Sequence, residues 1–310
     1  MYVAAFFGLG RDPVAHVRTL FASPDDPAGV VLPIGIFRDD PRLGYTHVPL
    51  RSGRHKKAEF DVTYSIDAAS CRVTPDPLEA RGSVLVLGDS FTFGHGVADI
   101  EAYPAVLGAS YWRTYKVRNC AGMGWGTGQA ALLVDGALAT SSRPTAIVYA
   151  WIWPNSQRNY LRRSWLTLQN QFKRRNVHFE LVGGRLRYEG TAGPELAIDD
   201  HAAGLPDKER ALTLALVQHM ATAASRASVR FHVVLLPWGD PAAPAAIDDD
   251  LVDFMRRHGI VFVDLRRLES KRSAGPLGLD RTAFFPVDGH PTPTWHATVA
   301  AALANHISLR

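Results

Sequence analysis

The sequence lacks several features that would place the protein in a specialised class. Among its 310 residues there is no apolar run of about 18 or more residues, so we expect no membrane-spanning helix. Only two cysteines occur, Cys71 and Cys120, and they form no CxxC pair, which argues against a structural zinc site. We expect two buried thiols, with a disulfide as the alternative. The formal net charge of +4 is low for a nucleic-acid-binding protein, and we expect no such partner.

The N-terminus also lacks a typical export signal. Its first residues, MYVAAFFGLGRD, contain a short apolar run with no basic region before it, which makes a poor signal peptide. The expected compartment therefore stays open. It is cytoplasmic for the chain as written, and periplasmic or secreted if an N-terminal anchor or signal has been removed.

The overall composition is that of a globular protein, with 46% hydrophobic and 21% charged residues. Positive charge gathers in four clusters, at residues 54–57, 158–163, 173–175 and 266–272. We expect these clusters to be solvated faces, with an anionic substrate or a membrane surface as the alternative.

The pattern of apolar residues divides the chain near residue 80. Residues 1–80 predict an N-terminal extension and a small β-rich module, with strands at 29–37, 59–67 and 71–74. In residues 81–310 strands and helices alternate, which predicts a three-layer α/β/α sandwich around a mainly parallel sheet. The expected strands begin at residues 83 and 116 and cover 144–153, 229–238 and 260–265, and the expected helices cover 102–115, 129–141, 210–228, 249–259 and 293–307.

One segment interrupts this alternation. VHFELVGGRLRYEG, residues 177–190, predicts a hairpin that turns at Gly183–Gly184. With its flanks it forms an insertion over about residues 165–207. Insertions at the rim of a sheet commonly shape a substrate pocket.

Residues suited to chemistry follow three of the predicted strands. Ser90 ends VLVLGDS, a glycine-rich loop containing Gly124 follows the second strand, and Asn155 follows the third. In a parallel sheet the carboxyl ends of the strands meet at one edge, where ligands bind. We therefore expect these residues to converge.

A base for Ser90 is present near the C-terminus, in FFPVDGHP. A histidine that takes a serine proton needs an acceptor on its other ring nitrogen. Asp288 and His290 are two residues apart, so on an extended segment their side chains share a face. Pro291 favours extended backbone at His290. The spacing therefore predicts Ser90 as nucleophile, His290 as base and Asp288 as its acceptor.

A tetrahedral intermediate also needs fixed hydrogen-bond donors for its negative charge. The backbone N–H of Ser90 lies near a predicted helix start, where amides point outward. The Gly124 N–H is a second candidate, because glycine lets the backbone approach a ligand closely. The side-chain amide of Asn155 is the third.

These blocks together resemble the SGNH (GDSL-type) hydrolase family over about residues 82–310. GDSFTFG resembles its nucleophile block, NCAGMGWGTGQ its second block, WPNS its third, and DGHP its acid–histidine block. The third block departs from the family in having Trp153 for glycine and Ser156 for aspartate, and the acid–histidine spacing is two rather than three. The resemblance implies the flavodoxin-like sandwich of that family, the same roles for the triad, and an oxyanion hole formed by Ser90, Gly124 and Asn155. The strand-rich leader resembles that of bacterial members.

Structural roles compete with these assignments. Ser90 could instead cap the helix that follows it. Asp89 is expected to brace the turn rather than to catalyse, and His296, which lacks a neighbouring acid, is expected to be structural. A metal site built on Asp89, Asp288 and His290 is not expected, because no recognisable set of three or four ligands is present. We expect no metal and no cofactor.

Four further residues could line a substrate site. Trp125 and Trp153 are expected to pack in the core, with a flat wall for an acyl chain or sugar ring as the alternative. His95 follows the nucleophile turn and could face the pocket. Arg158 is expected on a solvated face, and could instead meet an anionic substrate.

Three functions fit these residues. The first is a serine esterase that removes an acyl group, expected to be acetyl, from a carbohydrate or small-molecule ester. The second is an O-acyltransferase that passes the acyl group to a glycan hydroxyl, and the third is a non-catalytic carbohydrate-binding protein on the same fold. A typical α/β-hydrolase is excluded, because Phe91 and Thr92 follow Ser90 where G-x-S-x-G requires glycine second. The expected partner is a small-molecule or glycan ester, and the oligomeric state stays open.

Overall fold

A five-stranded parallel sheet forms the centre of the molecule. The computed structural model describes residues 35–237, 245–268, 277 and 279–309. The strand order is β11-β10-β7-β5-β6, with β5 at Ser83–Leu87, β6 at Lys116–Asn119, β7 at Ala146–Trp151, β10 at Arg230–Leu235 and β11 at Phe262–Asp264. All six residues of β7 are buried, as expected for a central strand that is covered on both faces.

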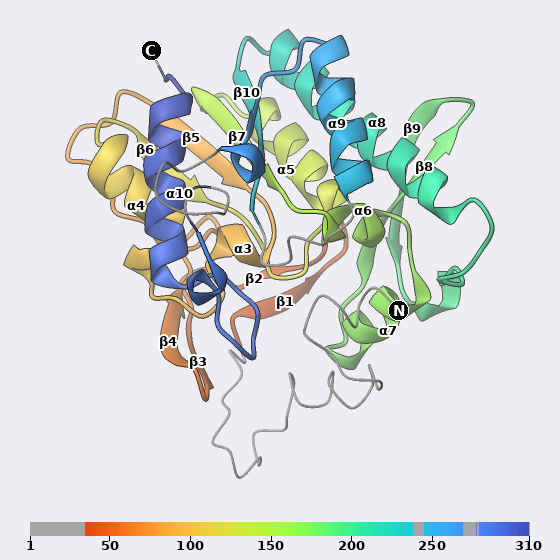
Figure 1. The fold of residues 1–310 in the computed structure, drawn as a ribbon, viewed down its shortest axis with the longest axis horizontal. Helices are drawn as coiled ribbons and strands as arrows, with labels where there is room; N and C mark the ends of the chain where they lie inside the picture. The colour runs from red at the N-terminus through yellow and green to blue at the C-terminus, as the bar shows by residue number, and fades with distance from the viewer. Residues whose placement is uncertain (1–34, 238–244, 269–276, 278, 310) are drawn as a thin grey trace.

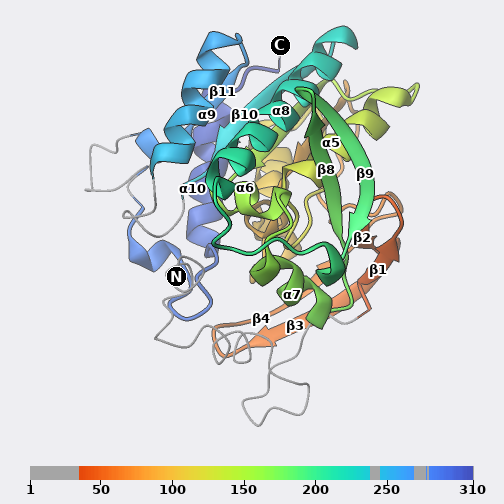
Figure 2. The ribbon, with the colours of Figure 1, turned by 90° about the vertical axis from the view of Figure 1, so that its right-hand side faces the viewer.

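Helices cover both faces of this sheet (Figures 1 and 2). The covering helices are α4 (Tyr103–Val106), α5 (Thr127–Ala139), α8 (Leu205–Arg226), α9 (Ala245–Arg257) and α10 (Pro293–His306). Helices α5, α8 and α9 share one apolar cluster, which contains Tyr149 of β7. Helices α4 and α10 share a second cluster, which contains Val148. Because neighbouring residues of a strand point to opposite faces, the two clusters are the two sides of the sheet, and the predicted three-layer sandwich is confirmed.

Residues 37–73, here called the hairpin region, form two antiparallel hairpins beside the short helix α3 (Ser90–Phe93) (Figure 1). Strands β1 (Phe37–Asp40) and β2 (Gly44–His47) make the first, and β3 (Ser52–Lys57) and β4 (Phe60–Ser65) the second. The β-rich character of this part was predicted, but β2 and β3 were not, and only Phe37 of β1 falls within an expected strand. The division of the chain into two domains stays a prediction.

Two expected elements differ in the structure. The helix expected at 102–115 is only the short α4 followed by one π-helical turn over Leu107–Tyr111, which ends where the Trp112 N–H bonds to the Leu107 carbonyl. The strand expected at 71–74 is reduced to two isolated bridges of Arg72, one to Ile66 and one to Asn119. Apolar spacing does not distinguish these hydrogen-bond patterns from longer helices and strands. Most of the strand expected at 29–37 lies outside the described residues.

The predicted insertion contains the predicted hairpin. Strands β8 (Asn176–Val182) and β9 (Arg185–Ala192) pair antiparallel and turn at Gly183–Gly184, both of which have positive φ. Two helices precede them, α6 (Pro154–Asn159) and α7 (Arg163–Gln171). None of the helices in the described part of the chain is both long and apolar enough to cross a membrane.

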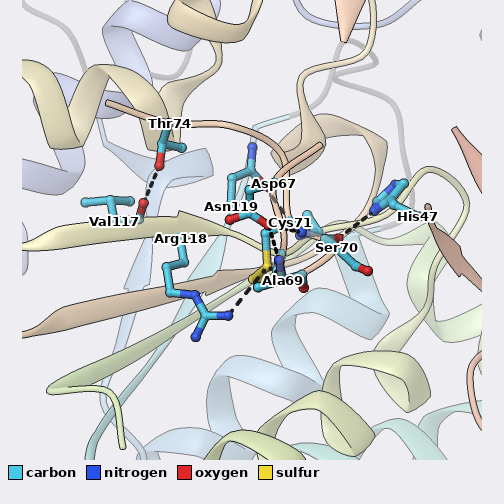
Figure 3. The surroundings of a disulfide bond; sticks show 11 residues. His47, Asp67, Ala69, Ser70, Cys71, Thr74, Val117, Arg118 and Asn119 are labelled. Atoms are coloured by element: carbon cyan, nitrogen blue, oxygen red, sulfur yellow. Dashed lines mark hydrogen bonds between the residues drawn. A yellow bond between two sulfur atoms is a disulfide. The ribbon is translucent and has the colours of Figure 1, made fainter. Parts of the chain in front are cut away.

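The two cysteines form a disulfide, and the expectation of two free thiols was wrong. Cys71, in the hairpin region, is bonded to Cys120, which directly follows β6, with their Cα atoms 4.3 Å apart (Figure 3). The Arg72 N–H donates to the Asn119 carbonyl beside them, so backbone pairing sets the two side chains within bonding distance. The pairing could not be read from the sequence, because 49 residues separate the two cysteines.

Candidate active site

Ser90 lies at the turn between β5 and the short helix α3 (Ser90–Phe93). The N-cap of α3 is Asp89, whose carboxylate accepts from the Phe91 N–H at 3.0 Å. The bracing role expected of Asp89 is therefore confirmed, and Ser90 is not the cap. As the first residue of α3, Ser90 has a backbone N–H without an acceptor inside the helix. Gly88 is needed before it, because a Cβ there would lie 2.3 Å from the Thr92 hydroxyl oxygen.

His290 and Asp288 meet Ser90 at this turn. His290 Nε2 is 2.9 Å from Ser90 Oγ, and His290 Nδ1 is 2.6 Å from Asp288 Oδ1. The Asp288–His290 segment is a turn rather than the extended segment expected, because Gly289 has φ +77° and its N–H bonds to the Phe285 carbonyl. The contacts from Ser90 to His290 and from His290 to Asp288 still form, although 200 residues separate His290 from Ser90 in the chain.

Asp288 is surrounded by cationic and imidazole groups. Its Oδ2 accepts from Lys57 Nζ at 2.5 Å, and His95 Nε2 is 3.3 Å from Oδ1. Burial opposes its ionisation most strongly, but the facing His95 and His290 outweigh burial and hold the pKa of Asp288 well below its usual range. The carboxylate is therefore ionised at neutral pH, as an acceptor for His290 requires.

His95, which could have faced a substrate pocket, packs against the ring of His290. The two rings stack with centroids 3.9 Å apart and an interplanar angle of 21°. Burial, followed by the charge of His290, lowers the pKa of His95 to about 3, so this ring is neutral at physiological pH. A neutral ring can lie on His290 without adding a second positive charge.

Asn155 presents an unpaired donor at the start of α6. Its side chain is 1% exposed, and Oδ1 accepts from Arg158 Nη1 at 3.0 Å. Nδ2 has no hydrogen-bond partner among the described residues. A buried N–H without a partner is costly, and a ligand oxygen would satisfy it.

Gly124 lies on a loop that the hairpin region holds in place. Its φ is +80°, and a Cβ there would meet Tyr45 Oη and Gln169 Nε2 at 3.0 Å. The Tyr45 hydroxyl donates to the Met123 carbonyl at 2.6 Å, one residue before Gly124. Glycine is required here both by conformation and by this close packing.

Arg158 is buried and paired, so the expectation of a solvated face was wrong. Its Nη1 lies 2.8 Å from Asp89 Oδ2 and also donates to the Trp125 carbonyl and to Asn155. The physical reason is that the buried Asp89 carboxylate needs a compensating charge. Arg158 thus links the Asp89–Ser90 turn, the Gly124 loop and Asn155, and its Nη1 is occupied by protein acceptors.

The other aromatic and imidazole candidates are buried. Trp125 and Trp153 belong to the apolar cluster under α5 and α8, as expected for core packing, and are 3% and 6% exposed. His296 is also fully buried, and its Nδ1 accepts from the Tyr103 N–H. Its expected structural role is confirmed.

Several residues of the hairpin region at this site were missed by sequence reasoning. Lys57 belongs to the cluster 54–57 that was expected to be solvated, yet its side chain is only 11% exposed and bonds to Asp288. Glu59 accepts from the backbone N–H groups of Val287 and Asp288. Arg72, fully buried, donates to the carbonyls of Phe93, Gly94 and Val97 behind α3. The one signal available was the His55-x-Lys57 spacing, which puts both side chains on one face of a strand.

His95, Asp288 and His290 are also the described side chains that could share a metal ion, since their ligand atoms lie within 4.8 Å of one another. The donor set fits a divalent cation poorly. Asp288 already accepts from Lys57 and His290, and an ion would have to displace these partners. The residues present fit a hydrogen-bonded triad better.

The chain is similar to known proteins in structure but not in sequence. No family model matches the sequence, and no curated protein is similar to it. The structure is similar to that of a protein assigned to the lipolytic G-D-S-L family from Desulfitobacterium hafniense DCB-2, with a TM-score of 0.45 and 12% identity, covering 73% of this chain and 100% of the other. It is also similar to an acetylxylan esterase from Geobacillus stearothermophilus, with a TM-score of 0.41 and 13% identity, covering 76% of this chain and 98% of the other.

Proposed function

We propose that this protein is a serine esterase in which Ser90, His290 and Asp288 form the catalytic triad. The observation that carries the proposal is the continuous pair of contacts from Ser90 Oγ to His290 Nε2 at 2.9 Å and from His290 Nδ1 to Asp288 Oδ1 at 2.6 Å. This arrangement lets one imidazole take a proton from the serine while its other nitrogen is held by a carboxylate.

Acylation begins when Ser90 Oγ attacks the carbonyl carbon of the ester and its proton passes to His290 Nε2. The negative charge on the carbonyl oxygen is received by the N–H groups of Ser90 and Gly124 and by Asn155 Nδ2. The bond to the alcohol oxygen then breaks, and the alcohol leaves with the proton from His290. An acyl group remains on Ser90.

Deacylation repeats these steps with water. His290 Nε2 takes a proton from a water molecule, the hydroxide attacks the acyl carbon, and the Ser90 Oγ bond breaks. Ser90 recovers its proton from His290, and the carboxylic acid is released. Asp288 stays ionised throughout, which agrees with its lowered pKa.

We propose that the acyl group removed is small, such as acetyl, and that it is esterified to a carbohydrate or another small-molecule alcohol. Ser90 is 6% exposed and the His290 side chain 12% exposed, so only a small part of either is open to solvent, which favours a small acyl group. The buried, unpaired Asn155 Nδ2 favours a polar ligand atom next to them.

Hydrolysis of a chromogenic acetyl ester tests the proposal. We expect saturable hydrolysis by the wild type and its loss in Ser90→Ala, while Ser142→Ala, at an exposed position, keeps the wild-type rate. Glycan acceptors are added in a parallel series. A rate that rises strongly with acceptor and is negligible in water would replace the esterase by an O-acyltransferase, and inactivity in both series would favour a carbohydrate-binding protein.

A further inference from the structure

The tip of the β3–β4 hairpin contacts the Asp288–His290 turn through two charged side chains. Lys57, the last residue of β3, reaches Asp288 Oδ2 at 2.5 Å. Glu59, in the two-residue turn that follows, accepts from the N–H groups of Val287 and Asp288 at 2.9 and 2.7 Å. One hairpin turn therefore holds both the side chain and the backbone of the acid.

The two carboxylate oxygens of Asp288 have different partners. Oδ1 faces His290 and His95, whereas Oδ2 faces Lys57. Asp288 is 2% exposed, so Lys57 rather than bulk solvent is the hydrogen-bond partner of Oδ2. Without the Lys57 contact, the carboxylate could rotate about its Cβ–Cγ bond and weaken the contact to His290 Nδ1.

We propose that Lys57 is a positioning residue for the reaction, holding Asp288 Oδ2 so that Oδ1 stays aligned with His290. This inference rests on the proposed function. Lys57 touches no reacting atom and acts only through Asp288. Glu59 assists by fixing the backbone from which Asp288 projects.

The test compares Lys57→Met with Lys57→Arg and with Lys56→Met, which removes the neighbouring lysine charge from the same strand. We expect kcat/KM for the acetyl ester to fall about 10- to 100-fold in Lys57→Met, mostly in kcat, in line with the loss of a charge-assisted hydrogen bond. We expect recovery to within about fivefold of wild type in Lys57→Arg, and no change in Lys56→Met. Lys57→Gln replaces Lys57→Met if that variant does not fold.

A readout without substrate separates this inference from the proposed function. The proton between His290 Nδ1 and Asp288 is expected to give a far-downfield proton NMR resonance in wild type and Lys57→Arg, and to lose it by exchange with solvent in Lys57→Met. If the wild type proves inactive but shows the resonance, and Lys57→Met loses it, the positioning role is kept and the esterase is rejected. An unchanged resonance and an unchanged rate in a folded Lys57→Met would overturn the inference.

Discussion

The sheet edge and the hairpin region both reach the candidate site, but they contribute different things. The sheet edge presents Ser90, Gly124 and Asn155 at strand ends, where the topology places them together. The hairpin region contributes long side chains such as Tyr45 and Lys57, which hold loops of the sheet edge and of the C-terminal turn. We infer that one region carries the proposed chemistry and the other determines how accurately it is aligned.

The largest effect on activity is expected from removal of the proposed nucleophile or its general base. Ser90→Ala and His290→Ala should each lower turnover of the acetyl ester by about 10⁴-fold or more, because the nucleophile and its base act as a unit. A double variant should be no slower than either single variant. Residual activity within about tenfold of wild type in either variant would contradict the proposed roles of Ser90 and His290.

The next largest effect concerns the unpaired amide. Asn155→Ala should lower kcat by about 100- to 1000-fold, as removal of one oxyanion donor does, with little change in KM. Asn170→Ala, at an exposed position on α7, is the matched control. A loss below tenfold would remove Asn155 from the proposed oxyanion hole.

The disulfide joins the hairpin region to the sheet, so its removal tests how strongly that link stabilises the fold. The Cys71→Ala/Cys120→Ala variant should lose about 4 kcal/mol of unfolding free energy, from the entropy gained by opening a loop of 49 residues. Urea unfolding of the oxidised wild type and the variant measures this difference. Equal midpoints and slopes would show that the bond does not stabilise the connection between hairpin region and sheet.

The buried histidines are expected to make the stability of the fold depend on pH. Burial lowers the pKa of His47 to about 4 and that of His296 to about 3, against an ordinary value near 6.5. Below pH 6.5 the unfolded chain binds protons that the folded chain does not. The unfolding free energy should therefore fall between pH 6.5 and 4, by up to about 1.4 kcal/mol per pH unit for each such histidine.

Two histidine variants test the cause of this dependence of unfolding free energy on pH. His296→Leu should flatten it, whereas replacement of the exposed His201 by glutamine should leave it unchanged. His219 contributes with the opposite sign, because its hydrogen bond to Asp135 raises its pKa and stabilises the fold as the pH falls. Unfolding free energies that are constant from pH 6.5 to 4 would contradict the neutral, buried state of these rings.

The difference between the two regions also explains what could be predicted from the sequence. Alternating apolar strands and helices indicate the sandwich, and the sandwich brings Ser90 and Asn155 to one edge. The contacts of the hairpin region have no such pattern. β3 has the sequence SGRHKK, without an apolar side chain, so neither the strand nor the burial of Lys57 could be predicted from periodicity. Arg158 was misplaced for the same reason, since its burial depends on Asp89, which is 69 residues away in the chain.

Labelling of Ser90 by a fluorophosphonate tests the central claim most directly, because the reagent reacts only with an activated serine. We expect one adduct per chain in intact-mass measurements, located on Ser90 by peptide mapping. Labelling should be lost in Ser90→Ala and strongly slowed in His290→Ala. A folded wild-type protein that stays unlabelled, or that is labelled at another serine, would contradict the account.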